Sequence, residues 1–152
     1  MADYFFDSSA LVKAYIAETG TTWVRTILDD EQHRIYISQM AALEVVAALT
    51  RRFHVGDLTL QERDQAAHDV RNDCMDYLAI GVTHEFIETA IDFALRHNLR
   101  AYDAAQLASA VTVRNVLSQT PEYAGLTLAS ADFELNRAAA LEGLQVEDPN
   151  TH

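Results

Sequence analysis

Four acidic side chains stand at positions where an acid is unexpected. Asp7 follows the apolar stretch "YFF", Glu44 interrupts "MAALEVVAAL", Asp103 opens the alanine-rich "DAAQLASAV", and Asp132 follows "LTLASA". Carboxylates that lie close together raise each other's pKa unless a positive charge lies among them. Mg²⁺ and Mn²⁺ prefer oxygen ligands and are held by one to several carboxylates plus water. The four acids therefore suit a divalent cation if the fold brings them together.

Each acid also has a simpler explanation when it is taken alone. Asp7, Asp103 and Asp132 all stand where a helix is expected to begin, so each carboxylate could cap that helix. Glu44 could pair with Arg51, seven residues further along the same helix. Only the convergence of all four acids favours a metal site, and the residues alone leave both explanations open.

Motifs of other chemistries are absent from the chain. It has no Gly-rich phosphate loop, no Gly-x-Ser-x-Gly elbow, and no paired-Cys or His-Glu-x-x-His zinc signature. The single cysteine, Cys74, cannot form an intramolecular disulfide, and we expect a reduced thiol. The six histidines stand at polar positions, and we expect all of them on the surface: residues 33, 54, 68, 84, 97 and 152.

Short apolar runs alternate with longer helical patterns. The apolar runs predict strands at 3–7, 34–38, 77–82, 126–130 and 144–148, most of them buried on both faces. The pattern predicts an α/β fold, a three-layer α/β/α sandwich with a central parallel sheet. Ligands of such sheets bind beyond the carboxyl ends of the strands, where Asp7 and Asp132 stand. The expected helices are 9–18, 21–30, 39–54, 60–76, 84–97, 103–117 and 132–142.

The 152 residues fit one domain, which we place at 1–148, followed by a C-terminal tail at 149–152. No targeting signal or membrane-spanning run is visible, so we expect a cytoplasmic protein with no membrane contact. The net charge of −12 argues against non-specific nucleic-acid binding through bulk charge. Ten of the eleven basic residues are arginine, however, and arginine binds phosphate with a two-pronged fork.

Four segments, in order, resemble the PIN-domain nucleases, and specifically the VapC-type toxins of bacterial toxin–antitoxin pairs. They are "YFFDSSALVKAYI", "SQMAALEVVAALTRR", "LRAYDAAQLASAV" and "LTLASADFELNRAAALEGLQV". The resemblance implies a Mg²⁺- or Mn²⁺-dependent endoribonuclease in which metal-activated water hydrolyses an RNA phosphodiester. It also implies a homodimer and a cognate antitoxin that holds the enzyme inactive. The positions that match the family's acids are Asp7, Glu44, Asp103 and Asp132.

The same resemblance points to further residues. Ser130 is similar to a family serine or threonine that orients the fourth acid, although it could simply cap a strand end. Some members carry another acid near the fourth, and Glu134 is the only nearby candidate. The basic residues near the acids are candidates for holding RNA phosphates, or else are ordinary helix-end charges: Lys13, Arg51, Arg52 and Arg100.

Two other functions remain open from the sequence. One is a catalytically silent PIN-like scaffold that binds RNA or a protein, which would retain the same acids without cutting. The other is a phosphoryl-transfer protein of the receiver or haloacid-phosphatase type. A receiver needs an acidic pair and a late lysine, and the phosphatase needs Asp-x-Asp. Here Asp7 is followed by Ser8 and Ser9, and Lys13 is the only lysine.

Overall fold

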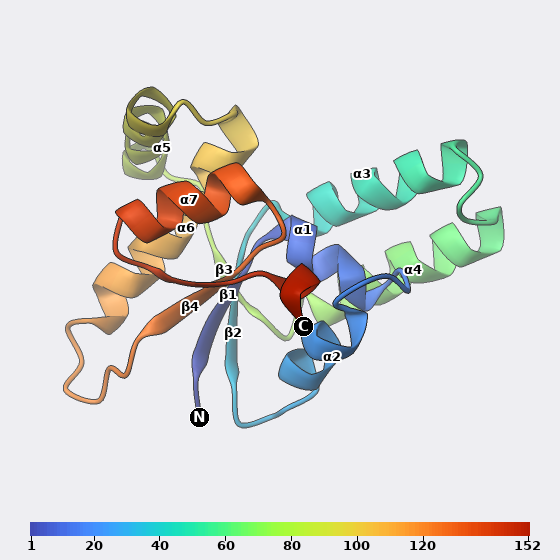
Figure 1. The fold of residues 1–152 in the computed structure, drawn as a ribbon, viewed down its shortest axis with the longest axis horizontal. Coiled ribbons are helices and arrows are strands. Elements are labelled where there is room, and N and C mark those ends of the chain that lie inside the picture. The colour runs from blue at the N-terminus through green and yellow to red at the C-terminus, as the bar shows by residue number, and fades with distance from the viewer.

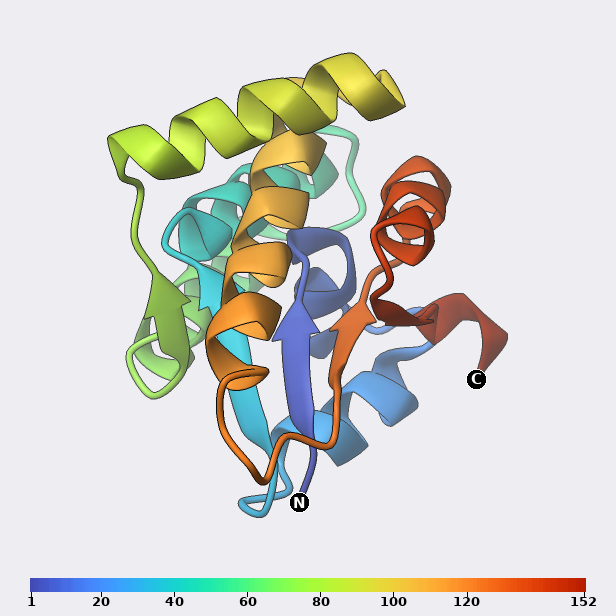
Figure 2. The same cartoon turned by 90° about the vertical axis from the view of Figure 1, so that its left-hand side faces the viewer.

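A computed structural model, which describes all of residues 1–152, has one five-stranded sheet. Its strand order is β3-β2-β1-β4-β5, and every neighbouring pair is parallel. The arrowheads of β1 and β4 therefore point to the same edge of the sheet, where α6 begins (Figure 2). The strands are β1 (Asp3–Phe6), β2 (Arg34–Ser38), β3 (Leu78–Ile80), β4 (Leu126–Ala129) and β5 (Gln145–Glu147).

Helices cover both faces of the sheet (Figure 1). Phe5 of β1 points into a core shared with α5, α6 and α7, and Phe6 points into a second core shared with α1, α2, α3 and α4. These two cores confirm the predicted α/β/α sandwich. The helices are α1 (Ser8–Leu11), α2 (Thr21–Leu28), α3 (Ala41–His54), α4 (Leu60–Asp73), α5 (His84–His97), α6 (Ala101–Leu117) and α7 (Phe133–Leu141), with 3₁₀ turns η1 (Val12–Ala14) and η2 (Pro149–Thr151).

The structure differs from the expected elements in the segment after Asp7. The helix expected at 9–18 is short: α1 passes into η1, and the chain then turns toward α2. The Thr21 hydroxyl donates to the carbonyl oxygens of Lys13 (2.9 Å) and Ile16 (3.0 Å). In a longer helix these carbonyl groups would accept hydrogen bonds from backbone N–H groups of the next turn. The Thr21 hydroxyl donates to them instead, so the helix can end early at this point.

Burial differs from the sequence pattern in three places. β3 is an edge strand with one neighbour, so Leu78 and Ala79 are exposed rather than buried on both faces. α3 is apolar on most sides, yet only one stripe of it is buried, and Leu43 is 62% exposed. His97, the last residue of α5, is buried, and its Nε2 contacts Oε1 of Glu142, the residue after α7, at 2.6 Å.

Residues 149–152, expected as a tail, pack against the start of the chain. Pro149 is buried, and a Cβ added at Gly20 would collide with its carbonyl group. Gly20 also has a φ of 88°, which favours glycine. The ring of His152 stacks on Trp23 of α2 with 4.5 Å between centroids. No helix of the structure combines the length and the apolar character that crossing a membrane requires.

Candidate active site

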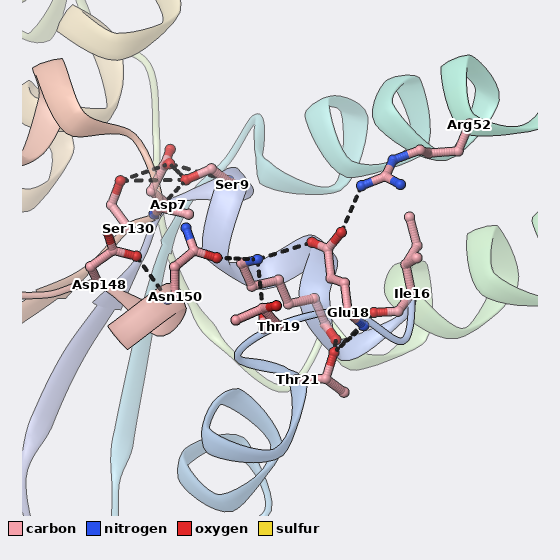
Figure 3. A network of polar contacts seen from close by, with 12 residues as sticks. Asp7, Ser9, Ile16, Glu18, Thr19, Thr21, Arg52, Ser130, Asp148 and Asn150 are labelled. Carbon is pink, nitrogen blue, oxygen red and sulfur yellow. Dashed lines mark hydrogen bonds and ion pairs between the residues drawn. The ribbon is translucent and has the colours of Figure 1, made fainter. Parts of the chain in front are cut away.

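Asp7 leaves the central strand and caps α1, as expected. Its backbone N–H still belongs to the sheet and donates to Ala129 O (3.0 Å), whereas its side chain accepts from Ser9 N (3.1 Å). The same carboxylate oxygen, Oδ2, also accepts from the hydroxyls of Ser9 and Ser130. Burial raises the pKa of Asp7, and the hydrogen bonds from Ser9 and Ser130 oppose the rise. Asp7 is thus a buried acid held in one orientation (Figure 3).

Ser130 and Asp132 stand where the neighbouring strand β4 ends. Ser130 is fully buried; its N–H donates to Glu147 O (3.1 Å), and its hydroxyl bridges Asp7 Oδ2 (3.3 Å) and Asp132 N (3.1 Å). Asp132 caps α7, because its Oδ1 accepts from Leu135 N (2.8 Å). The structure therefore brings Ser130 between the first and fourth acids.

Glu44 lies in the first turn of α3, half-buried beside α1 and α6. The Ser8 hydroxyl donates to its Oε2 (2.7 Å), and Gln106 Nε2 donates to its Oε1 (3.0 Å). The sequence also allowed an ion pair between Glu44 and Arg51. That alternative was wrong, because the structure contains no such pair. Burial raises the pKa of Glu44, Ser8 opposes the rise, and the negative charges of Asp7 and Asp103 add to it.

Asp103 lies in the first turn of α6, whose N-cap is Arg100. No hydrogen bond from the helix N-terminus reaches its carboxylate, so the capping explanation fails here. Burial raises the pKa of Asp103 to about 6; the charges of Asp132 and Asp7 contribute to the rise, and Arg100 opposes it. The charges of the acids thus act on one another: Asp7 and Asp103 act on Glu44, and Asp132 and Asp7 act on Asp103.

The donor set fits a hard divalent cation, since all four side chains offer carboxylate oxygens whose mutual repulsion a cation would relieve. Gln106 Oε1, on the side chain that holds Glu44, is also buried without a hydrogen-bond partner. The carboxylates are nevertheless not gathered tightly: no three acidic, histidine or cysteine side chains converge as a metal site. Serine hydroxyls and an amide occupy part of their oxygen atoms instead.

The basic candidates divide into two pairs. Lys13 is buried, and its Nζ donates to Glu18 (3.1 Å), Thr19 O (2.9 Å) and Asn150 (2.9 Å). Arg52 pairs with Glu18 (2.6 Å) and Asp57 (3.2 Å). Arg51 and Arg100 are exposed and have no partner within the protein. Only Arg51 and Arg100 are therefore available to a ligand.

A cleft of about 410 Å³ opens beside Glu44. Its walls include Ser8, Arg51 and Tyr102, together with apolar side chains of η1 and α3 such as Leu43. Glu134, the candidate fifth acid, is exposed and pairs with Arg137 (3.0 Å) on its own helix.

Sequence reasoning missed the side chains that hold the acids. Ser8 and Gln106 both donate hydrogen bonds to the Glu44 carboxylate. Ser9 donates to Asp7 and to no other acid. Gln106 had a visible signal, because it lies three residues after Asp103 in a helix that is otherwise nearly all apolar there. Asn136, whose Nδ2 donates to Ser130 O (2.8 Å), had none.

Comparisons with known proteins place the sequence in a family. Residues 4–141, which include all four acids, match the PIN domain. Ribonuclease VapC45 of Mycobacterium tuberculosis (strain CDC 1551 / Oshkosh) is 31% identical over 142 residues, which cover 93% of this chain and 92% of that protein.

Two solved structures share the fold. PAE2754 from Pyrobaculum aerophilum superposes with a TM-score of 0.65 and 18% identity, over 99% of this chain and 91% of that one. DNA-bound VapBC from Salmonella typhimurium gives a TM-score of 0.62 and 12% identity, over 98% and 99% of the two chains. At these identities the likeness shows the architecture alone.

Proposed function

This chain belongs to the PIN-domain family and is a relative of the VapC ribonucleases, and from that premise we propose a Mg²⁺- or Mn²⁺-dependent endoribonuclease that acts as a toxin. One observation carries the proposal: burial raises the pKa values of Asp7, Glu44 and Asp103, and the negative charges of neighbouring acids raise those of Glu44 and Asp103 further. Such a cluster is unfavourable for folding alone and favourable for holding a cation.

The residues that would hold the ion are Asp7, Glu44, Asp103 and Asp132. A bound ion of this kind lowers the pKa of a water molecule and neutralises charge that develops on the phosphate. The chain supplies the orientation of its ligands: Ser9 and Ser130 fix Asp7, and Ser8 and Gln106 fix Glu44. Partners of this kind keep ligand oxygens in place and raise metal affinity.

Arg51 and Arg100 are the proposed phosphate contacts, because they are exposed beside the acids and have no other partner. Lys13 is left out, since its three hydrogen bonds all go to the protein. Ser130 acts on Asp7 and Asp132 and not on the substrate, because it is fully buried.

Cleavage of RNA by purified protein in Mg²⁺ or Mn²⁺ tests the activity. Asp7→Asn and Asp103→Asn should each abolish cleavage, because each removes a ligand charge at nearly constant side-chain volume. Asp92→Asn, an exposed acid on α5, is the matched control and should cleave like the wild type. Combining Asp7→Asn with Asp103→Asn should add little further loss, since the ligands act as a unit.

Two results would count against this assignment. Full activity in Asp7→Asn would remove that residue from the site. A wild type that binds RNA but cuts none with either metal would favour the catalytically silent scaffold instead.

The proposed partners are a second copy of the chain and a basic antitoxin. The likeness to VapBC supports an antitoxin, and the net charge of −12 suits a basic protein through steering and complementarity. The exposed apolar side chains of α3 beside the acids offer a contact surface, from which an antitoxin arginine would reach the carboxylates. Expression of the wild type alone should arrest growth, whereas Asp103→Asn should not.

A further inference from the structure

Tyr102 carries an aromatic ring that the fold does not use. The residue precedes Asp103 in the first turn of α6 and is 56% exposed, and it makes neither a ring–ring contact nor a side-chain hydrogen bond within the protein. Its ring lines the cleft beside Glu44, and so does Leu43 of α3, which is 62% exposed. Two large apolar side chains from different helices thus border one opening next to the acids.

The charge of the molecule limits how it can hold a polyanion. Eight of the eleven basic side chains have partners within the protein, and the others are Arg51, Arg71 and Arg100. Only Arg51 and Arg100 lie beside the acids, and the protein as a whole carries a net charge of −12. Phosphate contacts are therefore few, and the affinity for RNA needs a second source.

We propose that Tyr102 and Leu43 form a platform on which one unpaired base of the RNA stacks. The proposal rests on the ribonuclease function above and deepens it. Base–aromatic stacking is a strong contribution to single-strand binding, and it does not depend on positive charge. The cleft gathers the kinds of group that a nucleotide needs: the carboxylate of Glu44, an apolar surface that includes Leu43 and Tyr102, and the unpaired Arg51 guanidinium.

The platform also constrains the substrate. A base inside a duplex is stacked on its neighbours and cannot lie on a protein ring, so recognition of RNA by stacking uses single-stranded loops, bulges and ends. The bond that is cut should therefore lie next to an unpaired nucleotide.

Binding measurements in a silent background test the platform directly. The protein is Asp7→Asn, and the probe is a fluorescein-labelled single-stranded RNA 12-mer of mixed sequence, with Mg²⁺ present. Adding Tyr102→Ala should weaken binding about tenfold, the order expected for losing one base–aromatic stack. Tyr102→Phe keeps the ring and should bind like the parent. Leu43→Ala should weaken binding less, and Leu95→Ala, at a leucine on α5 that is even more exposed, should not weaken it.

A series of probes, each lacking one base, identifies the stacked nucleotide. One abasic position should weaken binding by a factor similar to that of Tyr102→Ala, and combining the two should add little, because both remove the same contact. The dependence of log K on log salt should be shallow, with a slope of about −1.4 for two single-strand phosphate contacts. Arg51→Gln should reduce that slope by about 0.7, and Tyr102→Ala should leave it unchanged.

Several outcomes would overturn the platform. One is RNA binding by Tyr102→Ala that equals the binding of its parent. Another is an effect of Tyr102→Ala that adds fully to the effect of every abasic position. Intact RNA binding by Tyr102→Ala together with loss of antitoxin co-purification would assign the surface to a protein partner. The ribonuclease proposal is tested separately. RNA cleavage by the wild type would uphold it even if the platform failed. If the wild type cut no RNA but Tyr102→Ala still weakened RNA binding, the base contact would stand and the ribonuclease proposal would fall.

Discussion

Asp103 shows how one carboxylate can oppose folding. Its pKa lies at about 6, above the ordinary 3.8, because burial and the neighbouring Asp132 and Asp7 disfavour its charge. A raised pKa means that the folded protein binds the proton more tightly than the unfolded chain does. The stability that comes from the protonated form is complete below about pH 4 and is lost as the pH rises through about 6.

The melting temperature in EDTA should therefore fall between pH 5 and pH 7.5, and it should fall less in Asp103→Asn. At pH 7.5 the variant should melt at a higher temperature than the wild type, because it carries no charge to desolvate. Differential scanning fluorimetry at several pH values makes the measurement. Asp92→Asn, whose side chain is exposed, should keep the wild-type dependence. An identical dependence in wild type and Asp103→Asn would show that Asp103 is not the responsible group.

At the level of single residues, helix capping could be predicted from the sequence, whereas the contacts that hold the acids could not. Asp7 and Asp132 were predicted as helix caps and are caps, because capping depends only on the local chain. The partners of Glu44 could not be predicted, since Ser8 and Gln106 reach it from elements far away in the sequence. Arg51 was the natural local partner, but it forms no ion pair with Glu44, although both residues line the same cleft.

Among the elements, η1 and η2 are joined through the ammonium group of Lys13. Its contacts to Glu18, Thr19 and Asn150 tie the turn after α1 to the C-terminal turn, as the neighbourhood of Asn150 and Glu18 in Figure 3 shows. Arg52 of α3 extends the connection by pairing with Glu18. The segment that carries Asp7, Ser8 and Ser9 is thus held at its far end by the loop before α2 and by η2.

Lys13→Met should lower the free energy of unfolding by about 2 kcal/mol, because it removes the three hydrogen bonds that the buried ammonium group donates. Asn150→Ala removes one contact at an exposed residue and should cost about 1 kcal/mol. Asn150→Asp keeps an acceptor for Lys13 and serves as the matched control, with stability close to the wild type. Urea denaturation measures all three. Wild-type stability in Lys13→Met would show that the Lys13 contacts contribute nothing.

The elements were predicted well where their pattern was long and periodic, as in α5 and α4 with its Thr59 capping box. Two misjudgements have physical causes. The apolar run at 77–82 has the composition of a buried strand, but no sequence signal says that β3 lies at the sheet edge. The split of the first helix depends on Thr21 and on Pro149, which lies at the other end of the chain.

For the whole molecule, a divalent metal should act as a stabilising ligand. Only the folded chain brings Asp7, Glu44, Asp103 and Asp132 to one edge of the sheet, so Mg²⁺ or Mn²⁺ should raise the melting temperature. Glu44→Gln should weaken that response, because it removes one charge from the set. Fluorimetric titration with each metal provides the measurement. A shift of equal size in the wild type and in Glu44→Gln would point to non-specific screening of the net negative charge.

The contacts of Glu147 and Asn150 have a consequence for how the chain is made. Ser130 depends on Glu147 O, and Lys13 depends on Asn150, whereas Asp7 and Glu44 are translated long before either. Chains fold as they emerge, beginning with their N-terminal parts. A ribosome that synthesises this chain therefore carries the acids without their complete supports until residues 147–150 have left the exit tunnel. The hydrogen bonds that support Asp7 and Lys13 therefore form later than the segment that they hold.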